Sequence, residues 1–204
     1  LLANRGDHHC YTGLAREISG RTGNPTCHPD HAELTVGDSP IDLQLNTELC
    51  SRYSATLLEK NGASSPLGPE ILAPLEAAEI HSVSPAVDAT NLSNLEFGQP
   101  THCFDADTIV GGIRIRLSTE GETAWPLFSE DRVTVPTGSI VIADDEKILA
   151  IAGVIGCEES KTTETTSRII VESAAFDPVS VRKASRALGI HTDSSARFER
   201  GSDP

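Results

Sequence analysis

The chain has 204 residues, of which 38% are hydrophobic, and this length can bury the core of one large domain or two small ones. No apolar run approaches the roughly 20 residues that a membrane-spanning helix requires, so the sequence predicts no membrane partner. Acidic side chains outnumber basic ones by 30 to 16 and leave a net charge of −14, which argues against DNA or general nucleic-acid binding, because Lys and Arg neutralise phosphates.

Residues 1–40 are predicted to precede the main domain. Their first element is a short helix over 12–20, indicated by an apolar face at helical spacing that comprises Leu14, Ala15 and Ile18. Gly20 and Gly23 should end this helix. Residues 26–40 are polar and rich in turn-forming types, which favours a linker.

The next segments alternate between apolar and polar residues and then change to a helical pattern. Half-buried strands are predicted at two alternating runs, Ile41, Leu43 and Leu45 and then Tyr53, Ala55 and Leu57. A helix should begin at Ser65-Pro66, because a capping hydroxyl and a Pro at the first helical position favour a helix start, and should run to about Glu79. Pro74 lies inside it and is expected to kink the axis, since an interior Pro costs about 3 kcal/mol.

The stretch from Val87 to Asp105 is rich in hydrogen-bonding side chains. Gly98 and Pro100 should force a turn within it, and the polar residues around that turn are Asp88, Thr90, Asn91, Gln99 and His102. A packed core needs few such groups so close together, so the stretch indicates a functional site. Cys103 follows His102 directly, but adjacent residues of an extended chain point to opposite faces, which argues against a thiol–imidazole pair.

Beyond residue 105 the pattern is mainly that of strands. Short apolar runs predict strands at 113–117, 133–135, 139–143, 148–152 and 169–172. Asp177-Pro178 starts the clearest helix, which has an apolar stripe and ends at Gly189, and a second short helix should run from about Asp193 to Arg200. Helices interspersed irregularly among many strands favour an α+β fold with mixed, largely antiparallel sheets and flanking helices.

Common catalytic motifs are missing from the sequence. It holds no Gly-x-Ser-x-Gly, Gly-x-x-x-x-Gly-Lys or His-Glu-x-x-His, so serine-hydrolase chemistry and nucleotide hydrolysis have no support. His8-His9-Cys10 and Cys27-His28 with His31 offer zinc-type ligands, but their spacing is not that of a common finger, and surface histidines in loops explain them better. We therefore predict no metal site. Five Cys without a framework favour free thiols in a reducing compartment and a cytoplasmic location.

Four blocks, in order, resemble the B3/B4 editing region in the beta subunit of bacterial phenylalanyl-tRNA synthetases. The first is Val-Asp-x-Thr-Asn leading into Gly-Gln-Pro-x-His-x-Phe-Asp, and the blocks span residues 87–105, 139–156, 171–178 and 192–204. The similarity covers roughly residues 4–204 and is specific after Val87. It implies that residues 41–204 form the editing-type domain, while residues 1–40 are a remnant of the preceding domain with a linker.

The resemblance implies a pocket that hydrolyses an ester. Asn91 and His102 would be its catalytic residues and would help to hold the attacking water, which an amide and an imidazole can do by hydrogen bonding. Glu172 would accept a hydrogen bond from the para-hydroxyl of a tyrosyl group, and a pocket built around such an acceptor can reject the analogue that lacks the hydroxyl. The implied substrate-binding positions are Gly153, Gly156, Glu172, Thr192 and Ser194.

Simpler explanations of these residues stay open. Taken alone, His102 fits a structural histidine, Glu172 fits a strand end that reaches solvent, and the two glycines fit ordinary turns. A non-catalytic structural or interaction module with the same fold is favoured by three departures from the family pattern. The Trp that the family usually has near Gly68 is missing, Cys157 replaces a Gly, and Ser194 replaces an Ala. A further alternative is a free-standing trans-editing relative, whereas the missing initiator Met suggests an excised or partial chain.

The implied reaction is hydrolysis of the ester in tyrosyl-tRNA that carries the phenylalanine tRNA, within an enzyme that aminoacylates this tRNA. No cofactor is implied for editing, whereas ATP and Mg would serve the synthetic reaction on the partner subunit. The implied partners are the acceptor end of the tRNA and, through the full beta subunit, the alpha subunit. Any RNA contact should favour the C-terminal cations, although a solvated helix face is the simpler explanation of Arg182, Lys183, Arg186, Arg197 and Arg200.

Overall fold

The computed structural model of the chain describes residues 5–27, 40–60 and 67–201. Its largest sheet has the strand order β1 (Leu43–Leu45), β4 (Ile113–Leu117), β7 (Ile140–Ala143), β8 (Ile148–Ile151) and β9 (Ile155–Gly156). A second sheet has the order β2 (Cys50–Glu59), β10 (Arg168–Phe176) and β3 (Thr101–Asp105), and a third consists of β5 (Thr123–Ala124) and β6 (Val133–Thr134). All pairings are antiparallel except β1 with β4.

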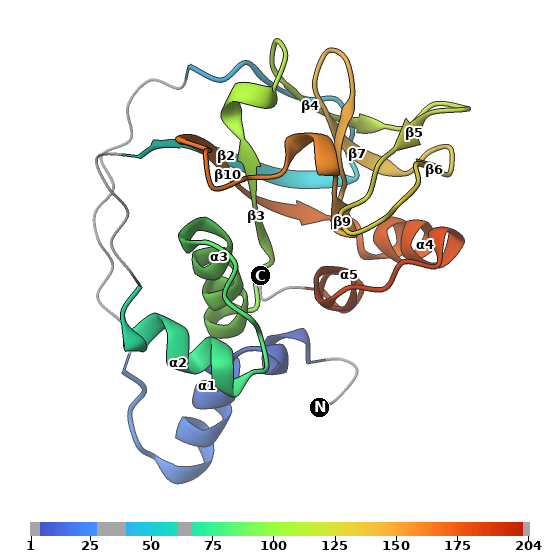
Figure 1. The fold of residues 1–204 in the computed structure, drawn as a ribbon. Coiled ribbons are helices and arrows are strands. Elements are labelled where there is room, and N and C mark those ends of the chain that lie inside the picture. The colour runs from blue at the N-terminus through green and yellow to red at the C-terminus, as the bar shows by residue number, and fades with distance from the viewer. Residues whose placement is uncertain (1–4, 28–39, 61–66, 202–204) are drawn as a thin grey trace.

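The α-helices within the described residues are α1 (Tyr11–Thr22), α2 (Pro69–Ala77), α3 (Pro85–Phe97), α4 (Pro178–Leu188) and α5 (Asp193–Phe198). Short 3₁₀ turns add η1 (Gly6–His9), η2 (Ala106–Thr108) and η3 (Glu158–Ser160). In Figure 1, α1, α2 and α3 gather on one side below the strands, and α4 and α5 lie on the other. This arrangement confirms the predicted α+β fold with largely antiparallel sheets. None of the helices in the described part of the chain is long and apolar enough to cross a membrane.

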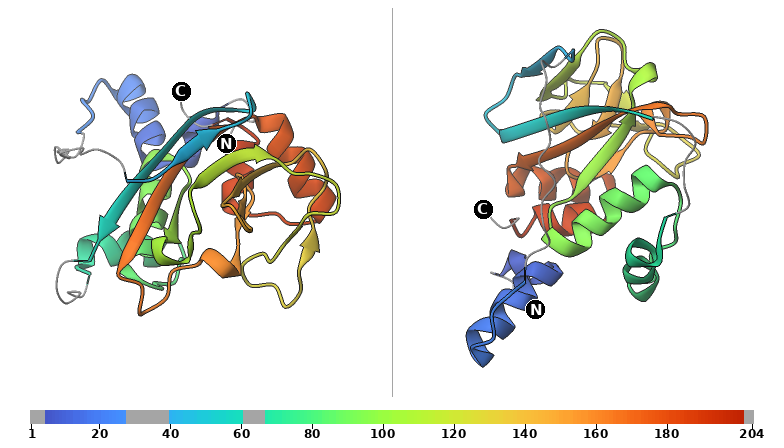
Figure 2. Two further views of the ribbon diagram at one scale, coloured as in Figure 1. Left: turned by 90° about the horizontal axis from the view of Figure 1, so that it is seen from above. Right: turned by 90° about the vertical axis from the view of Figure 1, so that its left-hand side faces the viewer.

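One hydrophobic core joins the two larger sheets to α4 and α5. Strands β7 and β8 are buried at every residue, which explains why their sequences are continuous apolar runs and not alternating ones. Strand β10 instead alternates, so that one face packs into the core and the other lies under α3 and solvent. The views in Figure 2 show β2, β10 and β3 lying side by side across this core.

Helix α3 occupies most of the polar stretch that was expected only to turn. Its N-terminus has a strong cap, because the Ser84 hydroxyl accepts a hydrogen bond from Val87 N at 3.3 Å and Pro85 takes the first helical position. Gly98 ends it with φ 73°, a conformation that glycine adopts without strain. The same capping signals correctly predicted α4. At α3 the same signals are present, but the polar residues inside the helix suggested a turn and a functional site.

Other boundaries differ in informative ways. Helix α2 begins at Pro69 and not at Ser65-Pro66, which lie outside the described residues, and Gly68 is its cap. Strand β1 was expected to be half-buried, but it is exposed at every residue because it lies at the edge of its sheet. Strand β10 extends to Phe176, so Glu172 lies in the middle of the strand and not at its end.

The first and last described segments meet. A Cβ atom placed on Gly6 would lie 1.9 Å from the carbonyl oxygen of Gly201, so the two backbones approach as closely as only glycine allows. Nearby, Arg197 Nη2 donates to the carbonyl of His9 at 3.4 Å. Helix α1 also packs on α3. The segment predicted to precede the domain therefore contacts it at both α3 and α5.

Asp88 is a structural residue, and its replacement should destabilise the fold. Its side chain is 1% exposed, Oδ1 accepts from Val83 N at 2.9 Å, and Oδ2 accepts from Ser82 Oγ at 2.5 Å. Asp88→Ala leaves both donors unpaired and is expected to lower the free energy of unfolding by about 2 kcal/mol in urea titrations. The exposed Glu76→Ala should change it by less than about 0.5 kcal/mol. Equal effects of the two changes would contradict the assignment.

Candidate functional site

A cavity of about 100 Å³ lies between the three-stranded sheet, the β8–β9 turn and α5. Its wall is mainly apolar, with side chains such as Ile142, Ile151, Val154, Phe176 and Phe198. Five of the seven residues predicted for the site also line it, namely His102, Gly153, Gly156, Glu172 and Ser194. A larger hollow of about 730 Å³ between α3 and the sheet is lined by none of the seven.

The register between β3 and β10 brings the two ionisable wall residues together. His102 is the direct antiparallel partner of Glu172, so both side chains leave the sheet on the same face. Phe104, two residues along β3, continues this face into the core and packs edge-on against the imidazole at a centroid distance of 4.8 Å. Cys103 points to the opposite face, where its Sγ lies 4.0 Å from Thr162 Oγ1. The expected separation of Cys103 from His102 is confirmed.

Glu172 is an uncompensated carboxyl group. It is 5% exposed, and its Oε1 has no hydrogen-bond partner among the described residues. Burial raises the pKa of Glu172 to about 8 from the ordinary 4.5. A buried polar atom without a partner costs about 1–3 kcal/mol, and more when it is charged. Such a group destabilises the free protein and is suited to accept or donate a hydrogen bond to a ligand.

His102 is held in its neutral form. Part of the side chain keeps some exposure, but its Nε2 atom is buried and has no partner among the described residues. Burial lowers the pKa of His102 to about 4. At neutral pH the imidazole is therefore uncharged and can bind water through Nε2, which is the state a general base requires.

The two predicted glycines serve different purposes. A Cβ atom on Gly156 would lie 2.6 Å from Cε1 and Nε2 of His102 and 3.1 Å from Leu127 Cδ1, so the imidazole rests directly on the Gly156 backbone. Gly153 has φ 69°, and a Cβ there would meet Val181 at 2.9 Å and Phe198 at 3.1 Å. Gly156 thus makes room for the predicted catalytic ring, and Gly153 makes room for the packing of α4 and α5.

The hydroxyls of Thr192 and Ser194 attach α5 to the β8–β9 turn, which forms part of the cavity wall. Thr192 Oγ1 donates to the carbonyl of Val154 at 2.7 Å, and Ser194 Oγ donates to that of Gly153 at 3.2 Å. Thr192 also caps α5, since its Oγ1 accepts from Ser195 N at 3.0 Å. Within the described chain Thr192 lies outside the cavity wall, whereas Ser194 is part of it.

Asn91 lies on α3 and, among the described residues, is not part of the cavity wall. Helix α3 packs on β3, the strand that carries His102. The neighbouring polar residues have structural partners. Thr90 Oγ1 donates to the carbonyl of Val87 at 2.8 Å, and Gln99 Nε2 donates to that of Ala174 at 2.9 Å. Most of the polar side chains that marked this stretch therefore stabilise the fold.

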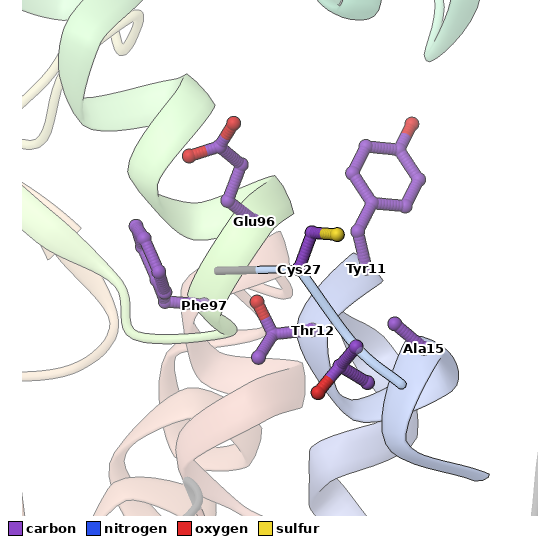
Figure 3. A pocket seen from close by; sticks show the side chains of 7 residues that line it. Tyr11, Thr12, Ala15, Cys27, Glu96 and Phe97 are labelled. Atoms are coloured by element: carbon purple, nitrogen blue, oxygen red, sulfur yellow. The ribbon is translucent and has the colours of Figure 1, made fainter. Parts of the chain in front are cut away.

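The histidines near the N-terminus are not surface loop residues, in contrast to the expectation. His8 is in η1 with 11% of its side chain exposed, and its Nε2 lies 3.7 Å from the Glu17 carboxylate. Cys10 is buried and caps α1. Among the described residues no group of three metal-ligating side chains occurs. Figure 3 shows the hollow of about 170 Å³ between α1 and α3, where Cys27 lies near Tyr11 and Glu96; His28 and His31 lie outside the described residues.

Three of the C-terminal cations have contacts within the chain. Arg182 Nη2 donates to the carbonyl of Glu199 at 3.2 Å, Arg197 Nη1 to that of Asp193 at 3.2 Å, and Arg200 Nη1 to that of Ala196 at 2.7 Å. The first bond links α4 to the end of α5, and the acceptors of the other two lie within α5. Arg182 is 46% exposed and fits the simpler explanation, a solvated helix face, whereas Arg197 is largely buried, with 11% of its side chain exposed.

Two residues of this region were not predicted from the sequence. Leu127 reaches Gly156 from the loop after β5. The Tyr53 hydroxyl on β2 is buried without a hydrogen-bond partner among the described residues. In the sequence Tyr53 belongs to an alternating strand-like run and Leu127 follows Pro126 between two strands, and no local signal distinguishes either from a core residue.

Comparisons with known proteins agree with the fold. A family model for the B3/4 domain matches residues 49–204. The phenylalanine–tRNA ligase beta subunits of Protochlamydia amoebophila and Geobacter sulfurreducens are 41% and 37% identical to the chain; the alignments cover 100% of the chain and 26% of each relative. A solved N-terminal fragment of the phenylalanyl-tRNA synthetase beta subunit from Pyrococcus horikoshii has a TM-score of 0.52 and 16% identity over 92% of this chain and 58% of that one. The chain thus spans about a quarter of the length of its curated relatives.

Proposed function

Because the chain belongs to the B3/4 domain family and resembles phenylalanine–tRNA ligase beta subunits, we propose that it is an editing domain that hydrolyses the ester of tyrosyl-tRNA carrying the phenylalanine tRNA. The observation that supports this most is the unpartnered Glu172 carboxyl in a cavity lined mostly by apolar residues. The whole enzyme would aminoacylate this tRNA in the cytoplasm, with ATP and Mg at a synthetic site on the alpha subunit. Editing itself would need no cofactor.

The cavity suits the side chain of an amino acid. Its volume of about 100 Å³ is well below the roughly 300 Å³ of a typical ligand pocket, so it takes a ring and not a whole nucleotide. The apolar wall would pack on the aromatic ring, and Glu172 would accept the hydrogen bond of the phenol. A phenylalanyl ring would leave this carboxyl unpaired, and such a penalty can reject the analogue that lacks the hydroxyl by large factors.

Water is the proposed nucleophile. The neutral imidazole of His102 would orient it and withdraw its proton as it attacks the ester carbonyl. Asn91 would assist from α3 once the acceptor end is bound. The Ser194 hydroxyl is bonded to the Gly153 carbonyl, and the Cys103 thiol faces the other side of the sheet. Neither is therefore a candidate for a covalent intermediate.

The three departures from the family pattern, at Gly68, Cys157 and Ser194, do not fill the cavity. Cys157 is wholly buried, and among the described residues it is not part of the wall. Gly68 caps α2, and the additional hydroxyl of Ser194 strengthens the attachment of α5. These positions therefore give little support to a non-catalytic module, which would also have no use for an unpaired carboxyl at Glu172.

A deacylation assay tests the proposal. The chain, within the assembled ligase, is expected to hydrolyse tyrosyl-tRNA for phenylalanine at least about 100-fold faster than the correctly charged phenylalanyl-tRNA. His102→Ala should reduce the tyrosyl rate by about 100-fold, a usual contribution of a general base. His81→Ala, which changes an exposed histidine before α3, should leave it unchanged. Equal rates on both substrates, or a rate independent of His102, would contradict the proposal.

A further inference from the structure

Tyr53 is the diagonal neighbour of Glu172 on the cavity side of the three-stranded sheet. In the register of β2 with β10, Ala55 is opposite Glu172 and Tyr53 is opposite Ala174. All of these side chains therefore leave the sheet on one face, and an aromatic residue reaches its diagonal neighbour across such a pair. Tyr53 and Ala55 both pack against the core. The strands β2 and β10 run side by side in Figure 2.

The Tyr53 hydroxyl has no structural task within the described residues. It is buried and lacks a hydrogen-bond partner, although a buried tyrosine hydroxyl usually has one. Burial raises the pKa of the Tyr53 phenol well above its usual range, and the charge of Glu172 raises it further, followed by that of Cys50. The phenol and the carboxyl group belong to diagonal neighbours on one face of the sheet, yet each keeps an unpaired polar atom.

The ionisable surroundings of Glu172 are few. His102 faces it from β3, and Tyr53 and Cys50 face it from β2. The wall contributed by the β8–β9 turn and α5 has no ionisable side chain, since it consists of apolar residues, glycines and Ser194. His102 lies on β3, across β10 from β2, and rests on Gly156. Tyr53 is a neutral donor on the β2 side of Glu172, although among the described residues it is not part of the cavity wall.

We propose that Tyr53 is a second specificity-determining residue, which donates a hydrogen bond to the same substrate hydroxyl that Glu172 binds. A phenol has one donor and two acceptor lone pairs, so a single carboxylate satisfies its donor and leaves its acceptor side unpaired in a buried site. With the substrate hydroxyl donating to Glu172 and accepting from Tyr53, each group becomes paired. A phenylalanyl ring would leave both of them unpaired. This inference rests on the proposed function and extends it.

The test measures binding and not hydrolysis. The probes are 3′-amino-3′-deoxyadenosine amides of tyrosine, phenylalanine and 4-aminophenylalanine, titrated calorimetrically into the 204-residue chain. Tyr53→Phe keeps the ring and removes only the hydroxyl. It is expected to weaken the tyrosyl probe about tenfold and to leave the phenylalanyl probe unchanged. The 4-aminophenylalanyl probe can donate to Glu172 but accepts poorly, so the variant should bind it nearly as the parent does.

A pH series separates recognition from packing. Preference for the tyrosyl probe should rise with pH as Glu172 ionises. Tyr53→Phe should move the midpoint of this rise to higher pH, because in the complex the substrate hydroxyl that donates to the carboxylate loses the bond it accepts from Tyr53. Tyr11→Phe is the matched control, since the Tyr11 side chain is 48% exposed on α1. It should change neither affinity nor midpoint.

The outcomes are distinguishable. A Tyr53→Phe variant with the full tyrosyl preference overturns the role of Tyr53 and leaves the editing proposal intact. Equal weakening of all three probes, or loss of folding, would identify Tyr53 as a packing residue and also overturn it. A parent chain without any preference for the tyrosyl probe contradicts the proposed function itself.

Discussion

Gly156→Ala is expected to reduce hydrolysis of the tyrosyl ester by about 100-fold while the chain remains folded. The new methyl group would lie 2.6 Å from Cε1 and Nε2 of His102, a separation that non-bonded carbon atoms do not tolerate. The imidazole cannot simply retreat, because Phe104 packs edge-on against it. Its Nε2 must therefore rotate away from the position where the water is activated. Single-turnover deacylation measures the effect, and urea unfolding verifies the fold.

Two controls make this result specific. Gly20 lies in α1, and a Cβ atom added there would have nothing within 4 Å, so Gly20→Ala should leave the rate unchanged and stabilise the chain by about 0.5–1 kcal/mol. Adding His102→Ala to Gly156→Ala should slow the reaction little further, because both changes remove the same group. A rate for Gly156→Ala equal to that of the parent would mean that the position of His102 is unimportant.

Glu172→Gln is expected to stabilise the chain at high pH by about 3–5 kcal/mol relative to the parent. The pKa of Glu172 is raised by burial from 4.5 to about 8, so over this range the folded state holds a proton that the unfolded state has released. Stability of the parent therefore falls as the pH rises from 4.5 to about 8 and stays low above it. Glutamine has no proton to lose, and the variant should escape this fall.

Urea titrations between pH 6.5 and about pH 9 isolate the effect. Burial lowers the pKa of His102 from 6.5 to about 4, so its contribution is complete above 6.5 and is lost only as the pH falls. The buried thiol of Cys157 is common to both chains and cancels. The Cys50 thiol, whose pKa is raised to about 11 mainly by burial, keeps its proton over this range in the folded state of both chains. Exposed Glu76→Gln is the matched control. Parallel stability curves for Glu172→Gln and the parent would show that Glu172 is not buried in the folded chain.

The same carboxyl should control selectivity. Glu172→Ala removes the acceptor and is expected to bring hydrolysis of the tyrosyl ester towards the phenylalanyl level. A folded Glu172→Ala variant that keeps the full selectivity would place recognition elsewhere. Greater stability of Glu172→Gln together with lower selectivity of Glu172→Ala would show that the carboxyl at this position lowers the stability of the fold and is needed for function.

Much of the fold followed from local patterns. The strand at 113–117 and the helix over 178–188 match β4 and α4, because alternation and capping are determined by neighbours in sequence. Helix α3 was missed because Asp88, Thr90 and Asn91 suggested chemistry, whereas two of them stabilise the helix and the segment before it. The exposed edge position of β1 depends on which strand pairs with it, which no local pattern encodes.

The prediction of the site residues depended on the resemblance to a known family more than on the spacing of residues in the sequence. His102 and Glu172 are 70 positions apart, and only the register between β3 and β10 makes them neighbours. Nothing in the residues themselves shows that their polar atoms lack partners, because this is a property of the packed chain. For the same reason Tyr53 looked like an ordinary apolar strand residue. Asn91 was carried over from the family motif, and its place outside the cavity wall makes its role the first to examine.

The contact between Gly6 and Gly201 joins two segments that are almost 200 positions apart in the sequence, and it does so through the backbone alone. A bulky residue at Gly6 would force the two segments apart, because even a Cβ atom there would lie 1.9 Å from the Gly201 carbonyl oxygen. The adjacent bond from Arg197 to the His9 carbonyl would break with it. Helix α1 would then keep its packing on α3 but lose its connection to α5.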